Sequence, residues 1–453
     1  MFTRLTLQRK LWRSDTIWTL PFLNFRIIKK IPSYMDERAL SRSQYWPRES
    51  LAELQRVRTE KILRDARVYP FWKSQLDAAG IGARGEYTNE TFQRIPIVTK
   101  KVFMSMSESE YSAGDRNDEW SRDFTSGSTG QPFCFYLDRT YELSLFAFCD
   151  RMFRIAAGGK KVPLVSLRSK NRIGVSLQRG GYMFFVRGYL GLRHRFEQLQ
   201  QYLASYPNGV VMLAFTSSLI ELARLSLEKK VTLPLRGIVS GGEGVRDSDR
   251  ALVRAAFNLD IFAGYSTREL GWIGFECEQH AIHINEEWAL VEIVDTEGRA
   301  LPDGERGRVV VTTFDNRVMP FIRYDTGDVG TIDTEPCTCG RTLRTIRVLG
   351  RQVEYLTFED GRTVSLLDFS QLFDGYTKVV KQFQIIQAEQ YRFLVKVVTG
   401  PSFEQFKDEL ATRLAQILHA NAVVEWSAVE SIPEGPNGKA LYFVSMERAR
   451  TLV

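Results

Sequence analysis

Apolar residues follow a helical period near the start of the chain. Between residues 50 and 79 they recur at close to helical spacing, at Leu51, Leu54, Val57, Ile62 and Leu63. This spacing predicts one or two helices. Ser50 and Glu53 stand three positions apart, as in a capping box, where each side chain bonds a free backbone amide at the helix start. We therefore expect a helix to begin near Ser50.

From about residue 120, short apolar runs typical of strands alternate with helical segments. Residues 216–228 are an expected helix with threonine and serine at its start. Strands separated by helices predict a parallel sheet with crossover helices. The expected strands are Val162–Leu167, Met183–Val186, Val210–Phe215, Gly237–Val239 and Leu259–Phe262.

Two later regions have different patterns. Residues 288–332 are rich in strand-forming residues around a turn at Asp303-Gly304, and they predict a β-rich subdomain. The fold class is therefore α/β, with a large domain at 1–350 that includes a helical arm at 1–90, and a small α+β domain at 351–453. In the small domain we expect an antiparallel strand pair, an amphipathic helix and two more strands, at Val379–Ile386, Tyr391–Val398, Phe403–Leu418, Ala422–Trp426 and Leu441–Val444.

Composition narrows the class of protein. The 453 residues are 44% hydrophobic and 25% charged, which is typical of a globular protein with at least two domains. The net charge of +7 suits an anionic substrate such as ATP. The sequence has no dense stripe of basic residues of the kind that binds nucleic acid, so we expect no nucleic-acid partner. No run reaches the roughly 18 apolar residues of a transmembrane helix, and we expect no signal peptide. Five cysteines are too few for a disulfide scaffold, so we expect a reducing, cytoplasmic setting.

The first residues combine basic and aromatic side chains. Residues 4–30 mix scattered arginine and lysine with tryptophan and phenylalanine. This pattern is typical of a packed amphipathic arm, and peripheral contact with a membrane surface is the alternative. The oligomeric state is open, and a homodimer is compatible with the sequence.

The segment Phe124–Pro132 gathers hydroxyls and glycines into one loop. Glycine lets the backbone approach a polyanion closely, and the amides and hydroxyls of such a loop can donate to phosphate oxygens. The loop lacks the GxxxxGK[ST] pattern, so it does not indicate a P-loop ATPase. Taken alone, such a loop is more often a flexible turn than a phosphate site.

Five more motifs fall at expected strand ends or turns. A tyrosine can stack on a base, a glutamate can bind Mg²⁺, an aspartate can accept both ribose hydroxyls, and a lysine on a turn can reach a carboxylate or phosphate. Each motif alone is compatible with an ordinary turn. They are Ser240-Gly241-Gly242-Glu243, Tyr265-Ser266-Thr267-Arg268-Glu269, Arg323-Tyr324-Asp325-Thr326-Gly327-Asp328, Leu349-Gly350-Arg351 and Pro436-Asn437-Gly438-Lys439.

In this order the motifs resemble the adenylate-forming superfamily of acyl-CoA synthetases, peptide adenylation domains and luciferases. They are most similar to its phenylacetate–CoA ligase and CapK-like branch. The similarity covers roughly residues 40–453. It is carried by Leu51–Ile81, IPIVTKKVF, TSGSTGQP, SGGE, YSTRELG followed by FEC, RYDTGD and CTCGR.

The resemblance implies how a nucleotide would be held. Gly241, Gly242 and Glu243 would border the adenine, and Tyr265 would stack on it. Asp328 would take the ribose hydroxyls. The phosphate loop would cover the β- and γ-phosphates with Thr125, Ser126, Gly127, Ser128, Thr129 and Gly130. Two departures from the family pattern are Gln131 in place of a lysine and Ser266 in place of a glycine.

The resemblance also implies catalytic roles. Glu269 would bind Mg²⁺, and Arg351 would contact ribose or phosphate beside the hinge. Lys439 would bridge the acid and the α-phosphate, and would then move away as a mobile C-terminal lid rotates. Carboxylate attack on the α-phosphate brings two anions together, so catalysis would rest on positioning and on charge stabilisation by Mg²⁺ and Lys439.

The implied activity is ATP- and Mg²⁺-dependent conversion of a carboxylic acid to an acyl-adenylate with release of pyrophosphate, followed by transfer to CoA. One alternative is a CapK-like enzyme with an acceptor other than CoA, in polysaccharide or amide biosynthesis. Another is a non-catalytic relative that binds nucleotide. The partners are thus a small carboxylic acid, whose identity is not readable, and CoA or another acceptor.

Cysteine and histidine spacing predicts a structural zinc site. A structural zinc ion needs four thiolate or imidazole ligands in tetrahedral geometry. The expected ligands are Cys277, His283, Cys337 and Cys339, with His280 as the alternative histidine. Members of the CapK-like branch often have this set, although buried free thiols with surface histidines are the other interpretation.

Overall fold

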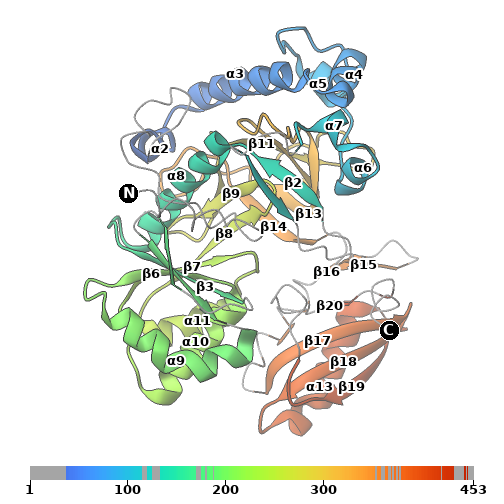
Figure 1. Cartoon of the computed structure of the whole chain (residues 1–453). Helices are drawn as coiled ribbons and strands as arrows, with labels where there is room; N and C mark the ends of the chain where they lie inside the picture. The colour runs from blue at the N-terminus through green and yellow to red at the C-terminus, as the bar shows by residue number, and fades with distance from the viewer. Residues whose placement is uncertain are drawn as a thin grey trace.

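The computed structural model describes residues 37–114, 120–124, 133–169, 175–178, 181–186, 188–351, 355–358, 363–365, 369, 372–373, 376, 379–419, 421–432, 443–444 and 446 (Figure 1). The described part up to residue 111 is helical, with α2 (Glu37–Ser43), α3 (Arg48–Ala66), α4 (Pro70–Ala78), α5 (Asn89–Gln93), α6 (Lys100–Met104) and α7 (Glu108–Tyr111).

Helices α3 and α4 confirm the helices expected over residues 50–79, and α3 begins within two residues of Ser50. It begins at Arg48, and its N-cap residue Pro47 makes no side-chain cap hydrogen bond. The expected capping box is therefore wrong. Glu53 instead accepts hydrogen bonds of 2.7 and 2.8 Å from Arg56, three residues along the helix, which leaves it no role at the helix start.

An eight-stranded sheet carries the expected parallel strands. Its order is β10-β9-β8-β7-β6-β3-β5-β4, and the neighbours among β3, β5, β6, β7 and β8 are parallel. All five residues of β6 are buried, as in a strand covered on both faces. The strands are β3 (Leu164–Ser169), β4 (Val175–Gln178), β5 (Gly181–Val186), β6 (Val210–Ala214), β7 (Leu235–Gly241), β8 (Ile261–Thr267), β9 (Gly271–Glu276) and β10 (Ile282–Ile284).

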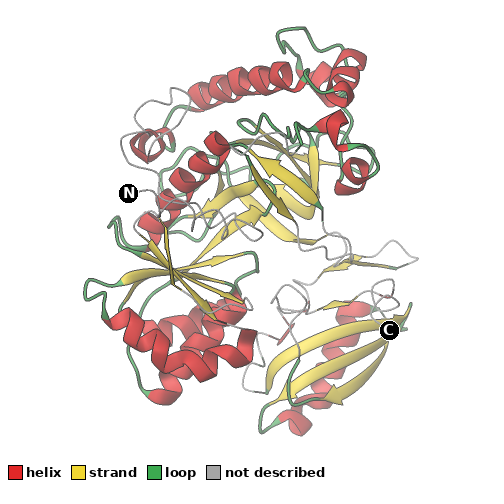
Figure 2. Ribbon diagram, in the orientation of Figure 1, coloured by secondary structure: helices red, strands yellow, loops and turns green. Residues whose placement is uncertain are grey.

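Crossover helices connect these parallel strands. Helices α9 (Gly188–Ala204), α10 (Thr216–Lys229) and α11 (Asp247–Phe257) lie together against one side of the sheet (Figure 2). Helix α8 (Arg139–Ala156) packs on β7, β8 and β9. The strand–helix alternation expected from the sequence is confirmed.

The β-rich region forms a four-stranded antiparallel sheet of order β11-β12-β13-β14. The burial of β13 alternates along most of its length, as expected for a sheet with one face on the core. The strands are β11 (Ala289–Val294), β12 (Gly307–Thr313), β13 (Tyr324–Ile332) and β14 (Ile346–Arg351), and a short pair, β1 (Ser121–Phe124) and β2 (Cys134–Leu137), lies nearby in Figure 1.

The C-terminal residues have a hydrophobic core of their own. Strands β17 (Val380–Glu389) and β18 (Arg392–Thr399) form the expected antiparallel pair, within a sheet of order β19-β18-β17-β20. Helix α13 (Phe403–Leu418) has the bounds expected from its apolar spacing. The remaining strands are β15 (Tyr355–Thr357), β16 (Thr363–Ser365), β19 (Val423–Ala428) and β20 (Phe443–Val444). The division of the chain at residue 350 stays a prediction.

The segment from α2 into α3 contacts residues far along the chain. Gln44 receives hydrogen bonds from the backbone of Thr342, at 2.9 Å, and from the side chain of Arg341, at 2.7 Å. Arg48 pairs with the buried carboxylate of Glu286. This ion pair and these hydrogen bonds hold the N-terminal helices on the β-rich region. Among the described residues, no helix meets the length and apolarity needed to span a membrane.

Candidate active site

The carboxyl ends of β7 and β8 lie side by side, with Gly241 opposite Gly264 in the register. Both glycines lie over the indole ring of Trp272 in β9. A Cβ atom on Gly241 would come within 2.8 Å of this ring, and one on Gly264 within 2.1 Å. Glycine is needed at both positions because the backbone passes so close to the ring. The SGGE and YSTRE motifs are therefore neighbours at one end of the sheet, where ligands of open parallel sheets bind.

Gly264→Ala is expected to lower thermal stability, because its methyl group would overlap Trp272 and overpacking of this kind costs about 1–3 kcal/mol. Gly244→Ala is the matched control, since a Cβ atom there meets nothing within 4 Å. Thermal denaturation of both variants tests the packing. Equal melting temperatures would contradict it.

Glu243 is held by the start of helix α10. Its carboxylate accepts hydrogen bonds from the backbone amide of Ser217, at 2.8 Å, and from the Ser217 hydroxyl, at 3.2 Å. A carboxylate at this position satisfies a free amide and is stabilised by the helix dipole. The side chain thus fixes the loop after β7. The role expected for residues 241–243 beside an adenine stays a prediction. Because the Glu243 side chain is bonded to Ser217 and the other two residues are glycines, the backbone of this segment would border the adenine.

The YSTRE motif is partly strand, whereas it was expected to follow one. Strand β8 continues through Thr267 because β9 pairs with it in an antiparallel hairpin, and Arg268 and Glu269 lie in the turn. Ser266 is in the strand, where the backbone does not need glycine. The motif therefore has a rigid half, with Tyr265, and a turn that carries Glu269.

Tyr265 and Asp328 are in direct contact, although they are 63 residues apart in the chain. The Tyr265 hydroxyl donates to Asp328 Oδ2 at 2.8 Å, and both residues are buried. The residues expected to hold adenine and ribose thus lie together, while their roles stay predictions.

A bulge in β13 directs Asp328. The register between β12 and β13 shifts between Arg308 and Val310, opposite the DTGD sequence, and Gly327 has φ +75°. The local turn is held by Gly327 N donating to Asp325 Oδ1 at 2.8 Å and by Asp328 N donating to Thr326 Oγ1 at 3.1 Å. Since left-handed φ suits glycine, Gly327 allows the strand to bend here. The RYDTGD motif is therefore a bulged strand rather than a turn between elements.

Glu269 is buried and held by a residue that the sequence analysis did not assign. The Tyr324 hydroxyl donates to Glu269 Oε1 at 2.9 Å. Tyr324 belongs to the RYDTGD motif, but it is 55 residues from Glu269, and no local pattern connects the two. This bond fixes the carboxylate that is expected to bind Mg²⁺.

Several predicted site residues lie outside the described residues. They are the phosphate loop Thr125–Gly130 and Lys439. The backbone of Arg351 is described: Arg351 ends β14 and lies opposite Asp328 in the ladder between β13 and β14. The ribose-binding pair expected from the sequence is therefore placed on adjacent strands, and the role of Arg351 stays a prediction.

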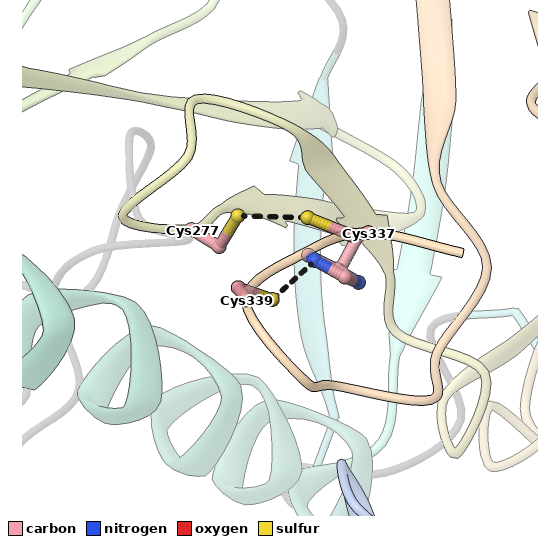
Figure 3. Close-up of side chains that lie close together, drawn as sticks. Cys277, Cys337 and Cys339 are labelled. Carbon is pink, nitrogen blue, oxygen red and sulfur yellow. Dashed lines mark hydrogen bonds between the residues drawn. The ribbon is translucent and has the colours of Figure 1, made fainter. Parts of the chain in front are cut away.

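The four predicted zinc ligands form one cluster. The ligand atoms of Cys277, His283, Cys337 and Cys339 all lie within 4.8 Å of one another. Cys277 Sγ is 3.7 Å from Cys337 Sγ, and Cys339 Sγ is 3.2 Å from His283 Nε2; Figure 3 shows the three cysteines turned toward the same point. Tetrahedral zinc with Zn–S bonds of roughly 2.3 Å needs sulfurs about 3.8 Å apart, so the geometry fits a zinc ion.

The histidine of the cluster is oriented for metal binding. His283 Nδ1 lies 2.8 Å from the carbonyl oxygen of Leu343, a contact that directs Nε2 toward the cysteines. Burial lowers the pKa of His283, which favours the neutral imidazole that a metal requires. His280 instead lies 3.0 Å from Arg250 and 3.3 Å from Glu276, so the geometry favours His283 as the ligand.

The cysteines differ in acidity in the metal-free protein. Burial raises the pKa of Cys277 to about 12. For Cys339, burial acts in the same direction, but hydrogen bonds from Arg341 outweigh it and the pKa falls below its usual value. A metal binding here would have to displace the proton of Cys277.

Comparison with known proteins extends these findings. Residues 356–446 match the family model of the CapK C-terminal domain. Phenylacetate-coenzyme A ligase of Thermus thermophilus is 29% identical over 367 residues, which cover 75% of this chain and 79% of that protein.

Solved structures share the fold. The crystal structure of 2-hydroxyisobutyryl-CoA ligase in the postadenylation state matches with a TM-score of 0.73 at 20% identity, over 95% of this chain and 98% of that one. An amide bond synthetase from Marinactinospora thermotolerans matches with a TM-score of 0.52 at 17% identity, over 73% and 68% of the two chains. Together with the sequence match, these similarities identify the chain as a homologue of phenylacetate–coenzyme A ligase that has a CapK C-terminal domain and the fold of the adenylate-forming CoA ligases.

Proposed function

We propose that the protein activates a carboxylic acid with ATP and Mg²⁺, releases pyrophosphate, and transfers the acyl group from the acyl-adenylate to CoA. The observation that carries this proposal is the convergence of three motifs at one end of the large sheet. Gly241 lies beside Gly264, and the next residue, Tyr265, bonds Asp328. An aromatic ring and a carboxylate in contact suit the base and the ribose of one nucleotide.

Charge stabilisation is the main chemical task of such a site. Attack of one anion on another requires cations near the α-phosphate. Mg²⁺, when bound, would supply part of this charge, and Glu269 would hold it, oriented by the Tyr324 hydroxyl at 2.9 Å. Lys439 would supply another positive charge between the two reacting groups. Arg351, on the strand beside Asp328, would contact ribose or phosphate.

The test is pyrophosphate release from ATP and Mg²⁺ with a panel of aryl, fatty and hydroxy acids, with and without CoA. Acid-dependent release is expected, together with AMP and an acyl-CoA when CoA is present. ATP binding without release for every acid would favour the non-catalytic alternative. Absence of nucleotide binding would reject the proposal.

An acceptor other than CoA is the second candidate. The CapK match of residues 356–446 supports it, as does the amide bond synthetase of the same fold, because the fold alone does not select the acceptor. In the same assay, amines and amino sugars would replace CoA. Acyl transfer to an amine without thioester formation would choose this candidate.

We propose that Cys277, His283, Cys337 and Cys339 hold a structural zinc ion. The support is the closeness of their ligand atoms, within 4.8 Å, and the contact that orients His283. With four protein ligands no position remains open for a substrate, so this ion would stabilise the fold and take no part in the reaction.

A further inference from the structure

An ion pair joins the turn after β8 to strand β1. Arg268 Nη2 donates to Asp123 Oδ1 at 2.7 Å, and Arg268 Nε donates to Asp123 Oδ2 at 3.1 Å. The two residues are 145 positions apart. This two-bond geometry is the one that a planar guanidinium and a carboxylate form best, and it fixes the direction of the arginine.

The two partners differ in exposure. Asp123 is 3% exposed, and its Oδ1 also accepts from the backbone amide of Phe124 at 2.8 Å. The Arg268 side chain is 37% exposed. The ion pair uses the Nε and Nη2 atoms of Arg268. Among the described residues, the remaining nitrogen, Nη1, has no hydrogen-bond partner. One edge of the guanidinium is therefore anchored in the protein, and the other is open to a ligand.

The arginine that carries this open edge lies next to a residue of the candidate nucleotide site. Arg268 directly precedes Glu269, the proposed Mg²⁺ ligand, in the turn at the end of β8. Among the site residues described at 241–243, 265–269 and 328, Arg268 has the only positively charged side chain. ATP brings several negative charges into this region, and a pre-oriented arginine binds phosphate oxygens with little loss of entropy.

We propose that Arg268 is a phosphate-binding residue of the nucleotide site and that Asp123 is its positioning residue. Arg268 Nη1 donates to a phosphate oxygen of ATP, while Asp123 holds the opposite edge of the guanidinium. This inference rests on the proposed function, since it needs a nucleotide beside Tyr265 and Glu269. It adds a contact that recognises the phosphates rather than the adenosine.

The test compares the affinity of the whole protein for the α,β-methylene analogue of ATP and for adenosine, with Mg²⁺, by calorimetry. Arg268→Gln should weaken binding of the analogue about 10–100-fold, as expected for a lost charge-assisted hydrogen bond, and should leave adenosine binding unchanged. Asp123→Asn should give a smaller loss with the same selectivity, because the arginine remains but is less firmly held. Arg299→Ala is the matched control: it also removes an arginine of an ion pair, in an exposed turn, and should change neither affinity.

Arg268→Gln leaves a buried carboxylate without its partner, so it also risks unfolding. The double variant Asp123→Asn/Arg268→Gln removes both charges and keeps two groups that can hydrogen-bond each other. It should stay folded and show the same selective loss for the ATP analogue. If it bound the analogue as tightly as the wild type, or lost both ligands equally, the inference would be overturned. Failure of the wild type to bind either ligand would instead reject the nucleotide site itself.

Discussion

Lys439→Ala is expected to slow acid-dependent pyrophosphate release by about 10²–10³-fold, the size of effect seen when one preorganised donor to a developing negative charge is removed. The expectation rests on the Pro436-Asn437-Gly438-Lys439 motif and on the resemblance that assigns this lysine to the α-phosphate. Binding of ATP should change little, since the lysine would act mainly in the transition state. A quenched-flow or coupled pyrophosphate assay gives the rate.

The second half-reaction provides the control for this variant. If the lysine moves away when the C-terminal domain rotates, Lys439→Ala should still convert a supplied acyl-adenylate and CoA to acyl-CoA at close to the wild-type rate. Lys407→Ala removes a lysine of the same region, on α13, that pairs with Glu404 at 3.8 Å, and should leave both steps unchanged. Equal losses in both steps would indicate a structural role for Lys439, and no loss would remove it from the mechanism.

Cys337→Ser is expected to abolish zinc binding and to lower the melting temperature strongly. In a structural site the binding free energy of the metal contributes to folding. Loss of a metal ligand belongs with the largest single-residue effects, about 4 kcal/mol, or roughly 8–16 °C for a domain of 150–250 residues. Because the ion would take no part in the reaction, the variant should retain activity at temperatures where it stays folded. Metal analysis by mass spectrometry and thermal denaturation provide the two measurements.

Cys134→Ser is the matched control for the zinc site. Cys134 is partly buried and accepts a hydrogen bond from Arg122 at 3.2 Å, outside the cluster. It should keep about one zinc ion per chain and a nearly normal melting temperature, as expected for a substitution away from the ligands. A wild-type protein without zinc, but with the same melting temperature in the presence of a chelator, would contradict the proposed site.

Periodic segments were the predictable part of the fold. The apolar residues of α13 recur at helical spacing and are buried at Phe403, Leu410, Leu414 and Leu418, so both of its ends could be predicted. Strand β9 has no alternation, because all six residues of Gly271–Glu276 are buried, and its pairing with β8 was missed. As a result, the YSTRE motif was expected after a strand, although its first half lies in one.

The candidate site was predictable motif by motif, but not in its contacts. Each motif carries its own chemistry in the sequence, and the cysteine and histidine spacing, together with the family resemblance, was enough to expect that these four side chains meet. The bonds of Tyr265 with Asp328 and of Tyr324 with Glu269 depend on how two sheets meet. The pair of Asp123 and Arg268 joins a third sheet, that of β1 and β2, to the turn after β8. No local pattern encodes such distances, because tertiary packing sets them.

The hydrogen bonds between Gln44 and residues 341–342 also affect how the chain folds during its synthesis. Gln44 lies 297 residues before Arg341, its side-chain partner. At a synthesis rate of about 5–20 residues per second, the ribosome needs roughly 15–60 s to reach that partner. During most of this time the inner face of α3 lacks strand β11, which later packs against it. The nascent chain therefore exposes apolar surface for tens of seconds, which is the interval in which a chaperone would bind it.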